Sequence, residues 1–250
     1  MASQQHAPLM ERLLPVICGV ADSTARTAEW YRTRTGVGVR APFRPEMRDH
    51  VPMAEVSSLT GRLLVATPAL ADPNFDRAVV LLLDHDEEGS LGVILNRPTP
   101  VGVGDILESW AALAGEPGVV FQGGPVSLDS ALGVGVVPGE GRGGKGASVP
   151  AGDGPLGWRR VHGAIGLVDL EAPPELLAAA LGSLRIFAGY AGWGPGQLEE
   201  ELVEGAWYVV ESEPGDVSSP DPGRLWRAVL RRQRNELAMV ATYPDDPSLN

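Results

Sequence analysis

Short apolar runs recur along the chain and predict a protein rich in strands. Runs of Leu and Val bounded by Gly, Pro or acidic residues are typical of strands. On this basis we expect strands at residues 62–67, 78–84, 91–96, 119–122, 131–137, 184–188 and 206–211, and one within 159–168. Every position from Val79 to Leu83 is apolar, so this strand is expected to be buried on both faces.

The connections between these runs indicate how the strands pair. Residues 85–90 form a short polar link that predicts a hairpin, and several other links are too short for a parallel crossover. Helices are expected where the apolar positions recur every three or four residues. These are residues 105–113, with Asp105 as cap and Glu108 completing a capping box, and residues 173–181, 195–205 and 221–232. The pattern predicts an α+β fold with a mixed, largely antiparallel sheet and flanking helices.

Residues 1–52 differ from the rest of the chain. They hold seven arginines against five acidic residues and show no sustained helical or strand period. We interpret them as a disordered N-terminal extension, or as sequence upstream of a start at Met53, in preference to a basic arm that docks on a partner. Residues 53–250 are expected to form a single domain.

The charge of the chain argues against two classes of partner. The net charge is −12, and residues 53–250 carry 27 acidic against 13 basic residues. Direct binding to DNA is therefore not expected, and neither is attraction to an anionic membrane. The single cysteine, Cys18, excludes an intrachain disulfide, and no apolar run approaches the ~20 residues of a membrane helix. These features favour a cytoplasmic protein.

Residues 138–157 contain eight glycines and partly match two nucleotide-binding motifs. In a phosphate loop, Lys145 would have to be followed by Ser or Thr to hold magnesium, but Gly146 follows it. The sequence after Gly146 also lacks a helix whose amides could meet a phosphate. A flexible loop is the favoured interpretation, and no nucleotide cofactor is expected.

Two charged clusters invite functional hypotheses. Residues 84–88 (DHDEE) offer metal-ligand types, but neighbouring side chains in a hairpin point in different directions, so a solvated acidic turn is favoured and no metal is expected. Arg227, Arg231, Arg232 and Arg234 could contact phosphates. They also lie near the predicted end of a helix, where cations complement the dipole, and we favour that structural role.

Five segments, each with a glycine or a proline, carry a resemblance to a known family. They are residues 61–68 (GRLLVATP), 72–77 (DPNFDR), 92–98 (GVILNRP), 121–126 (FQGGPV) and 187–199 (FAGYAGWGPGQLE). Their sequence and order resemble those of the AlgH/YqgE-like family of bacterial proteins, over about three quarters of the chain. The resemblance implies a sheet curled into a pseudo-barrel and a link, by name, to transcriptional regulation of alginate. It carries over no catalytic residue and no cofactor.

The residue types in these segments leave two functions open. The leading expectation is a binding protein with an unknown protein or small-molecule partner and an indirect regulatory role. The alternative is an enzyme or small-ligand protein with a pocket formed by Asn96, Arg97, Gly123, Gly124, Tyr190, Trp193 and Gln197. Residues 189–196 could instead be a tight turn, permitted by four glycines, in which Tyr190 and Trp193 only close the barrel end.

Overall fold

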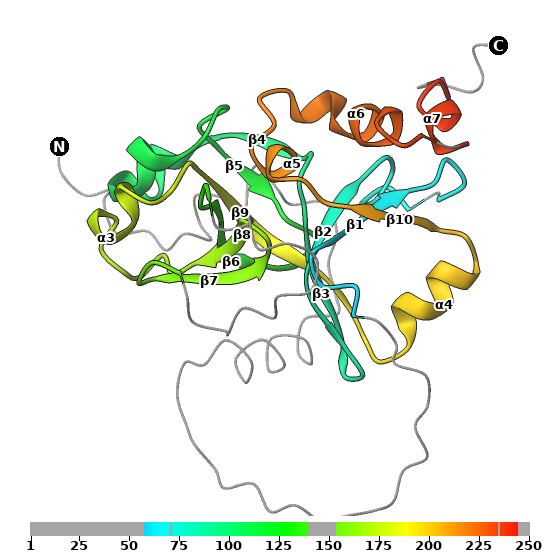
Figure 1. The fold of residues 1–250 in the computed structure, drawn as a ribbon, viewed down its shortest axis with the longest axis horizontal. Coiled ribbons are helices and arrows are strands. Elements are labelled where there is room, and N and C mark those ends of the chain that lie inside the picture. The colour runs from blue at the N-terminus through cyan, green and yellow to red at the C-terminus, as the bar shows by residue number, and fades with distance from the viewer. Residues whose placement is uncertain (1–57, 71, 140–153, 235, 245–250) are drawn as a thin grey trace, which may run out of the picture.

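The computed structural model describes residues 58–70, 72–139, 154–234 and 236–244. Its centre is a ten-stranded sheet (Figure 1). The strands are β1 (Arg62–Ala66), β2 (Val79–Asp86), β3 (Gly89–Ile94), β4 (Pro98–Gly102), β5 (Val119–Gln122), β6 (Val126–Val136), β7 (Trp158–His162), β8 (Ile165–Val168), β9 (Ser183–Trp193) and β10 (Trp207–Glu211).

The strand order along the sheet is β10-β1-β2-β3-β9-β6-β8-β7, with β5 bridging β4 and β9. All named pairs are antiparallel except β5 with β9. The sheet curls into a half-barrel, so the predicted mixed, largely antiparallel and curled sheet is confirmed (Figure 1). The helices are short, and the described part of the chain is mostly β with some helix.

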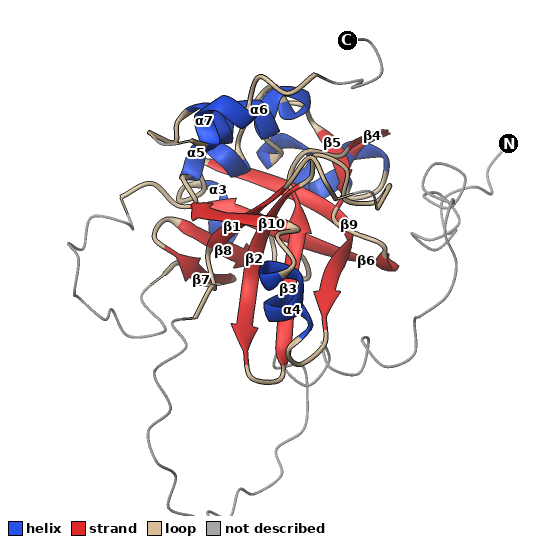
Figure 2. Cartoon of the chain, turned by 90° about the vertical axis from the view of Figure 1, so that its right-hand side faces the viewer, coloured by secondary structure: helices blue, strands red, loops and turns tan. Residues whose placement is uncertain are grey.

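The helices lie on both sides of the curl. They are α3 (Glu175–Ala178), α4 (Gln197–Val203), α5 (Pro214–Val217), α6 (Leu225–Arg231), α7 (Leu237–Val240) and the 3₁₀ helices η1 (Val103–Asp105), η2 (Glu108–Leu113) and η3 (Pro222–Arg224). Figure 2 shows α4 against the outer face of β3, while α5, α6 and α7 gather at one end of the curl. No helix among these is long and apolar enough to cross a membrane.

Strand β2 confirms the prediction of burial on both faces. Val79, Leu81 and Leu83 belong to the large inner core, together with Trp226 on α6. Val80 and Leu82 point the other way, into an outer core that α4 covers. Because successive side chains of a strand alternate between faces, an unbroken apolar run fits a strand that is covered twice.

Strand β9 joins the parts of the sheet. Its first residues pair with β6, Phe187 and Ala188 run parallel to β5, and its last residues pair with β3. The expected strand at 184–188 therefore covers only part of the first half of an eleven-residue strand. Residues 189–193 belong to this strand, so the prediction of a tight turn is wrong for them. Of the four glycines in 189–196, Gly189 and Gly196 have positive φ angles.

Other elements also differ from expectation. Residues 103–113 form η1 and η2 instead of one helix, and Asp105 lies in the first turn, where its Oδ2 accepts from the Gly102 amide at 3.1 Å. Residues 158–168 form a hairpin of two strands that turns at Gly163, which has a φ of 54°. Strand β4 was not predicted, because its two prolines disfavour a strand except at an edge.

One buried charge faces the inner core from β9. The Arg185 side chain is 2% exposed, and its Nη2 donates to the carbonyl oxygens of Glu116 and Ser219, both at 2.9 Å. Its Nε and Nη1 have no hydrogen-bond partner among the described residues. The guanidinium carbon lies 4.2 Å from the centre of the Phe121 ring, and burial lowers the pKa of Arg185 to about 10.

The predicted N-terminal extension, residues 1–52, and most of the glycine-rich segment, including Lys145, lie outside the described residues. The strands between residues 62 and 211 all belong to one sheet.

Candidate functional site

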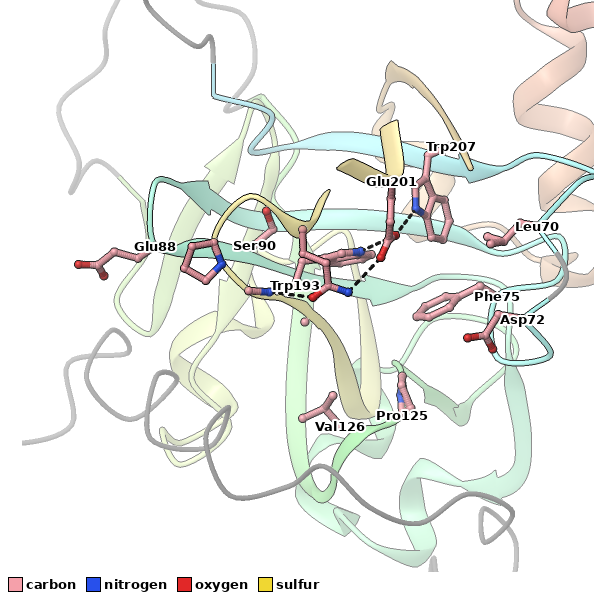
Figure 3. Close-up of a pocket in the computed structure, with 14 residues that line it drawn as sticks. Leu70, Asp72, Phe75, Glu88, Ser90, Pro125, Val126, Trp193, Glu201 and Trp207 are labelled. Atoms are coloured by element: carbon pink, nitrogen blue, oxygen red, sulfur yellow. Dashed lines mark hydrogen bonds between the residues drawn. The ribbon is translucent and has the colours of Figure 1, made fainter. Parts of the chain in front are cut away.

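A cleft of about 650 Å³ opens where the end of β9, the start of α4 and the loop before β2 meet (Figure 3). Its volume is that of pockets for small organic ligands. We call it the Trp193 cleft. It is lined by Leu70, Asp72, Phe75, Glu88, Ser90, Pro125, Val126, Gly192, Trp193, Gly194, Pro195, Gln197, Glu201 and Trp207.

Three aromatic rings form one wall of the Trp193 cleft. The ring of Phe75 stacks on Trp193 at 6.2 Å between centroids, and it meets Trp207 edge-on at 5.5 Å. Trp193 and Trp207 also meet edge-on, at 6.0 Å. Both tryptophans are buried and Phe75 is half-buried. Such mutual packing gives a wall whose rings hold one another in place.

The carboxylate of Glu201 holds this wall from α4. Its Oε2 accepts the indole N–H of Trp193 at 2.9 Å and that of Trp207 at 2.8 Å. Its Oε1 accepts from the side-chain amide of Gln197 at 3.0 Å, one helical turn earlier. Since each indole N–H can only donate, Glu201 supplies the acceptor that both buried tryptophans require.

Gln197 links the end of β9 to α4. Its Oε1 accepts from the Gly194 backbone N–H at 3.1 Å, while its amide nitrogen donates to Glu201. Gly196, with a φ of 76°, makes the turn that precedes the first helical residue. Gln197 is exposed, so its amide is also within reach of a ligand in the cleft.

The Trp193 cleft is acidic. Asp72, Glu88 and Glu201 line it, and none of the described residues that line it is lysine or arginine. Asp72 and Glu88 are exposed and lie toward opposite ends of the cleft (Figure 3). The cleft therefore presents an apolar wall with negative charge at its centre and at its rim.

A serine and a histidine lie at the edge of the cleft. Ser90 Oγ is 2.8 Å from His85 Nδ1, and the other ring nitrogen, Nε2, is 3.6 Å from Glu199 Oε1. His85 and Ser90 are a cross-strand pair of β2 and β3, and both are buried. His85 thus turns inward from the acidic hairpin, while Asp86 caps the turn by accepting from the Glu88 amide at 2.8 Å.

Asn96 and Arg97 lie in a second, smaller pocket of about 260 Å³, lined also by Asp76, Arg77, Gly223, Trp226 and Arg227. The structure therefore divides the expected pocket between two places. The Asn96 side chain holds the backbone, since its Oδ1 accepts from the Val79 amide at 2.9 Å and its Nδ2 donates to the Arg77 carbonyl at 2.8 Å. Arg97 donates to the Asp76 carbonyl. Burial lowers the pKa of Arg97 and the Asp76 charge opposes this.

The remaining candidates lie behind the cleft. A Cβ atom on Gly124 would lie 2.2 Å from the carbonyl carbon of Tyr190, so only glycine allows this close approach to β9. Gly123 packs in the same way against Gly189. The Tyr190 ring is buried in the inner core; burial raises the pKa of its phenol, and a hydrogen bond with Ser127 opposes this. These residues position the strand that carries Trp193.

Among the expected site residues, Trp193 and Gln197 thus line the larger cleft. Sequence reasoning missed Phe75, Glu201 and Trp207. The i, i+4 spacing of Gln197 and Glu201 was the one available signal, because it places both side chains on the same face of a helix. Phe75 and Trp207 had no such signal, since they meet only through the pairing of β1 with β10 and with β2.

Two arginines of the predicted basic cluster, Arg227 and Arg232, make contacts within the protein. Arg232 forms a bidentate ion pair with the buried Asp216, in which the Nη1–Oδ1 distance is 2.5 Å and the Nη2–Oδ2 distance is 2.8 Å. Arg227 donates to the carbonyls of Ala241 and Tyr243 at 2.6 and 3.0 Å. These two side chains tie α6 to α5 and to the segment after α7.

Comparisons with known proteins place the chain in a family. A UPF0301 protein of Streptomyces avermitilis is 88% identical over 199 residues, which cover 79% of this chain and 98% of the relative. A UPF0301 protein of Thermobifida fusca is 49% identical, over 77% of this chain and 96% of the relative.

Two solved structures are similar as well. A crystal structure of a Corynebacterium diphtheriae protein has a TM-score of 0.66 and 31% identity, and covers 79% of this chain and 95% of that one. The solution structure of the AlgH protein from Pseudomonas aeruginosa has a TM-score of 0.51 and 25% identity, and covers 78% of this chain and 100% of that one. Residues 63–238 match the family described as AlgH-like. The chain belongs to the AlgH-like family.

Proposed function

We propose that this protein is a cytoplasmic binding protein that takes a small molecule or a short peptide segment into the Trp193 cleft, and that any regulatory effect is indirect and follows from this binding. The observation that carries the proposal is the Glu201 carboxylate, which fixes two tryptophans and Gln197 at a cleft of ligand size. Pre-positioned aromatic and polar groups in a concave site are the usual features of ligand recognition.

A fragment screen by ligand-observed NMR tests this function. Hits on the full chain should weaken at least about tenfold with Phe75→Ala, because this change removes the half-buried part of the aromatic wall. Leu176→Ala is the matched control, since it removes an exposed apolar side chain on α3, outside the cleft. The proposal would be contradicted if the fragments bound Phe75→Ala as tightly as the native protein, or if the screen gave no hits.

Acyl transfer is a second candidate function, favoured by the contacts of His85. One ring nitrogen faces the Ser90 hydroxyl and the other faces Glu199, an arrangement of nucleophile, base and orienting acid. Binding remains the first candidate because Ser90 is only 2% exposed. A fluorophosphonate probe should label Ser90, and Ser90→Ala should abolish labelling, if the hydroxyl is a nucleophile. An unlabelled native protein would rule this chemistry out.

A further inference from the structure

The charge of the Trp193 cleft defines the class of its ligand. We infer that the cleft selects an organic cation, in which an alkylammonium or guanidinium group is attached to a small apolar body. This inference rests on the proposed function, since it names the ligand for the same cleft. It depends on the acceptors of Glu201, the aromatic wall and the acidic rim.

Glu201 keeps an unneutralised charge and a free acceptor position. A carboxylate offers about four lone-pair positions. The two indole N–H groups occupy those of Oε2, and the Gln197 amide occupies one at Oε1. All three donors are neutral, and no lysine, arginine or histidine of the described residues forms an ion pair with Glu201. One position and the whole negative charge thus remain for a cationic donor.

The aromatic wall suits the same ligand. Indole rings attract cations more strongly than other aromatic side chains, within about 6 Å of the ring centre. Trp193 and Trp207 are fixed in place by Glu201 and by Phe75, so a ligand need not order them on binding. Such preorganisation reduces the entropy lost on binding.

The acidic rim of the cleft also favours a positively charged ligand. Asp72, an exposed carboxylate, lies at one end of the cleft, so a cation that enters there meets negative charge (Figure 3). The smaller pocket that contains Asn96 and Arg97 has the reverse character, since three arginines and one aspartate line it. A metal ion is the less suitable cation, because the described residues contain no group of three or more His, Cys, Asp or Glu that could hold one.

A matched pair of probes tests this selection on the full chain. 3,3-Dimethylbutylammonium and 3,3-dimethylbutanol have nearly the same shape and both can donate a hydrogen bond, but only the first is charged. Calorimetric titration at low salt should show the ammonium ion binding about tenfold more tightly than the alcohol, and this preference should fall as salt screens the acidic rim. Glu201→Gln should reduce the preference to less than about threefold. Glu175→Gln, at an exposed carboxylate on α3, should change neither affinity.

The outcomes separate the two proposals. Equal binding of the ammonium ion and the alcohol would overturn the cation selection and leave ligand binding in the cleft standing. Binding of unrelated fragments but of neither probe would do the same. If no probe or fragment binds, the proposed function fails as well. Should Glu201→Gln fail to fold, Asp72→Lys at the exposed rim must lower the affinity for the ammonium ion but not for the alcohol, and an unchanged affinity for the ammonium ion would refute the inference.

Discussion

Trp193, the last residue of β9, and Trp207, the first residue of β10, donate their indole N–H groups to the same oxygen, Oε2 of Glu201. The two strands are not neighbours in the sheet, and α4 connects them in the sequence. One carboxylate therefore fixes the entry and the exit of this helical connection. The same atom orients the wall of the Trp193 cleft, so stability and binding should respond together to changes at Glu201.

Removing the Glu201 carboxylate should destabilise the fold. Glu201→Ala leaves two buried indole N–H groups without an acceptor, and we expect a loss of about 2 kcal/mol or more in the free energy of unfolding. Glu201→Gln retains an acceptor oxygen and should lose less. Urea denaturation measures both changes, and Glu200→Ala, at a neighbouring exposed residue, is the control. Equal losses for Glu201→Ala and Glu200→Ala would show that the indole bonds contribute nothing.

Gln197→Ala should have a smaller effect on stability. It removes the hydrogen bonds to the Gly194 amide and to the Glu201 carboxylate. The Gln197 side chain is exposed, so water can replace these partners. We expect a loss of about 0.5–1 kcal/mol in thermal or chemical unfolding. A loss above about 2 kcal/mol would mean that Gln197 is needed to form the turn before α4.

Gly124→Ala should destabilise the protein severely. The added methyl group would lie 2.2 Å from backbone atoms of Tyr190, which belong to β9 and cannot move without disturbing its pairing. We expect a cost of about 3 kcal/mol. Gly118→Ala is the matched control, because no atom lies within 4 Å of the added carbon. Similar melting temperatures for the two variants would contradict the close packing at Gly124.

Arg185→Met should stabilise the fold by about 1 kcal/mol, because methionine fills much of the same volume without a buried, unpaired charge. The pKa of Arg185 is lowered to about 10, so the folded protein holds this proton less tightly than the unfolded chain. The cost of the charge is therefore present in full at neutral pH and is relieved only as pH rises above about 10. The gain should be constant between pH 6 and 8 in urea denaturation. A destabilised variant would show that the bonds to Glu116 and Ser219 outweigh the burial of the charge.

A shortened chain that begins at Met53 should keep the melting temperature of the full chain within about 2 °C. The reason is the composition of residues 1–52, which lack a sustained helical or strand period. Calorimetry of both chains measures the difference. A drop of 10 °C would show that the N-terminal residues pack on the domain.

The sequence predicted those elements whose signal is local. The run from Val79 to Leu83 identified a doubly covered strand, because burial on both faces requires every position to be apolar. For the segment around Gly192 the prediction was wrong. Its glycines indicate a turn locally, whereas pairing with β3 and β6 continues the strand to Trp193. Tertiary pairing outweighs local propensity in such segments.

The candidate site was only partly predictable for the same reason. Trp193 and Gln197 were expected from one continuous segment, and they do line one cleft. Asn96 looked equivalent to them as a polar group at a strand end, yet its amide is used to bond the backbone of Val79 and Arg77. A sequence shows which polar side chains exist, but their hydrogen-bond partners are set by the fold.

The pairing of β1 with β10 also bears on how the protein is made. The first described strand has β2 on one side and the last strand on the other, so its sheet neighbours are synthesised at very different times. Until Trp207 to Glu211 have left the ribosome, one edge of β1 has no partner, and an open strand edge invites pairing with other chains. Contacts between such distant segments also slow folding. During synthesis, the nascent chain should therefore be most vulnerable to aggregation just before its last strand emerges.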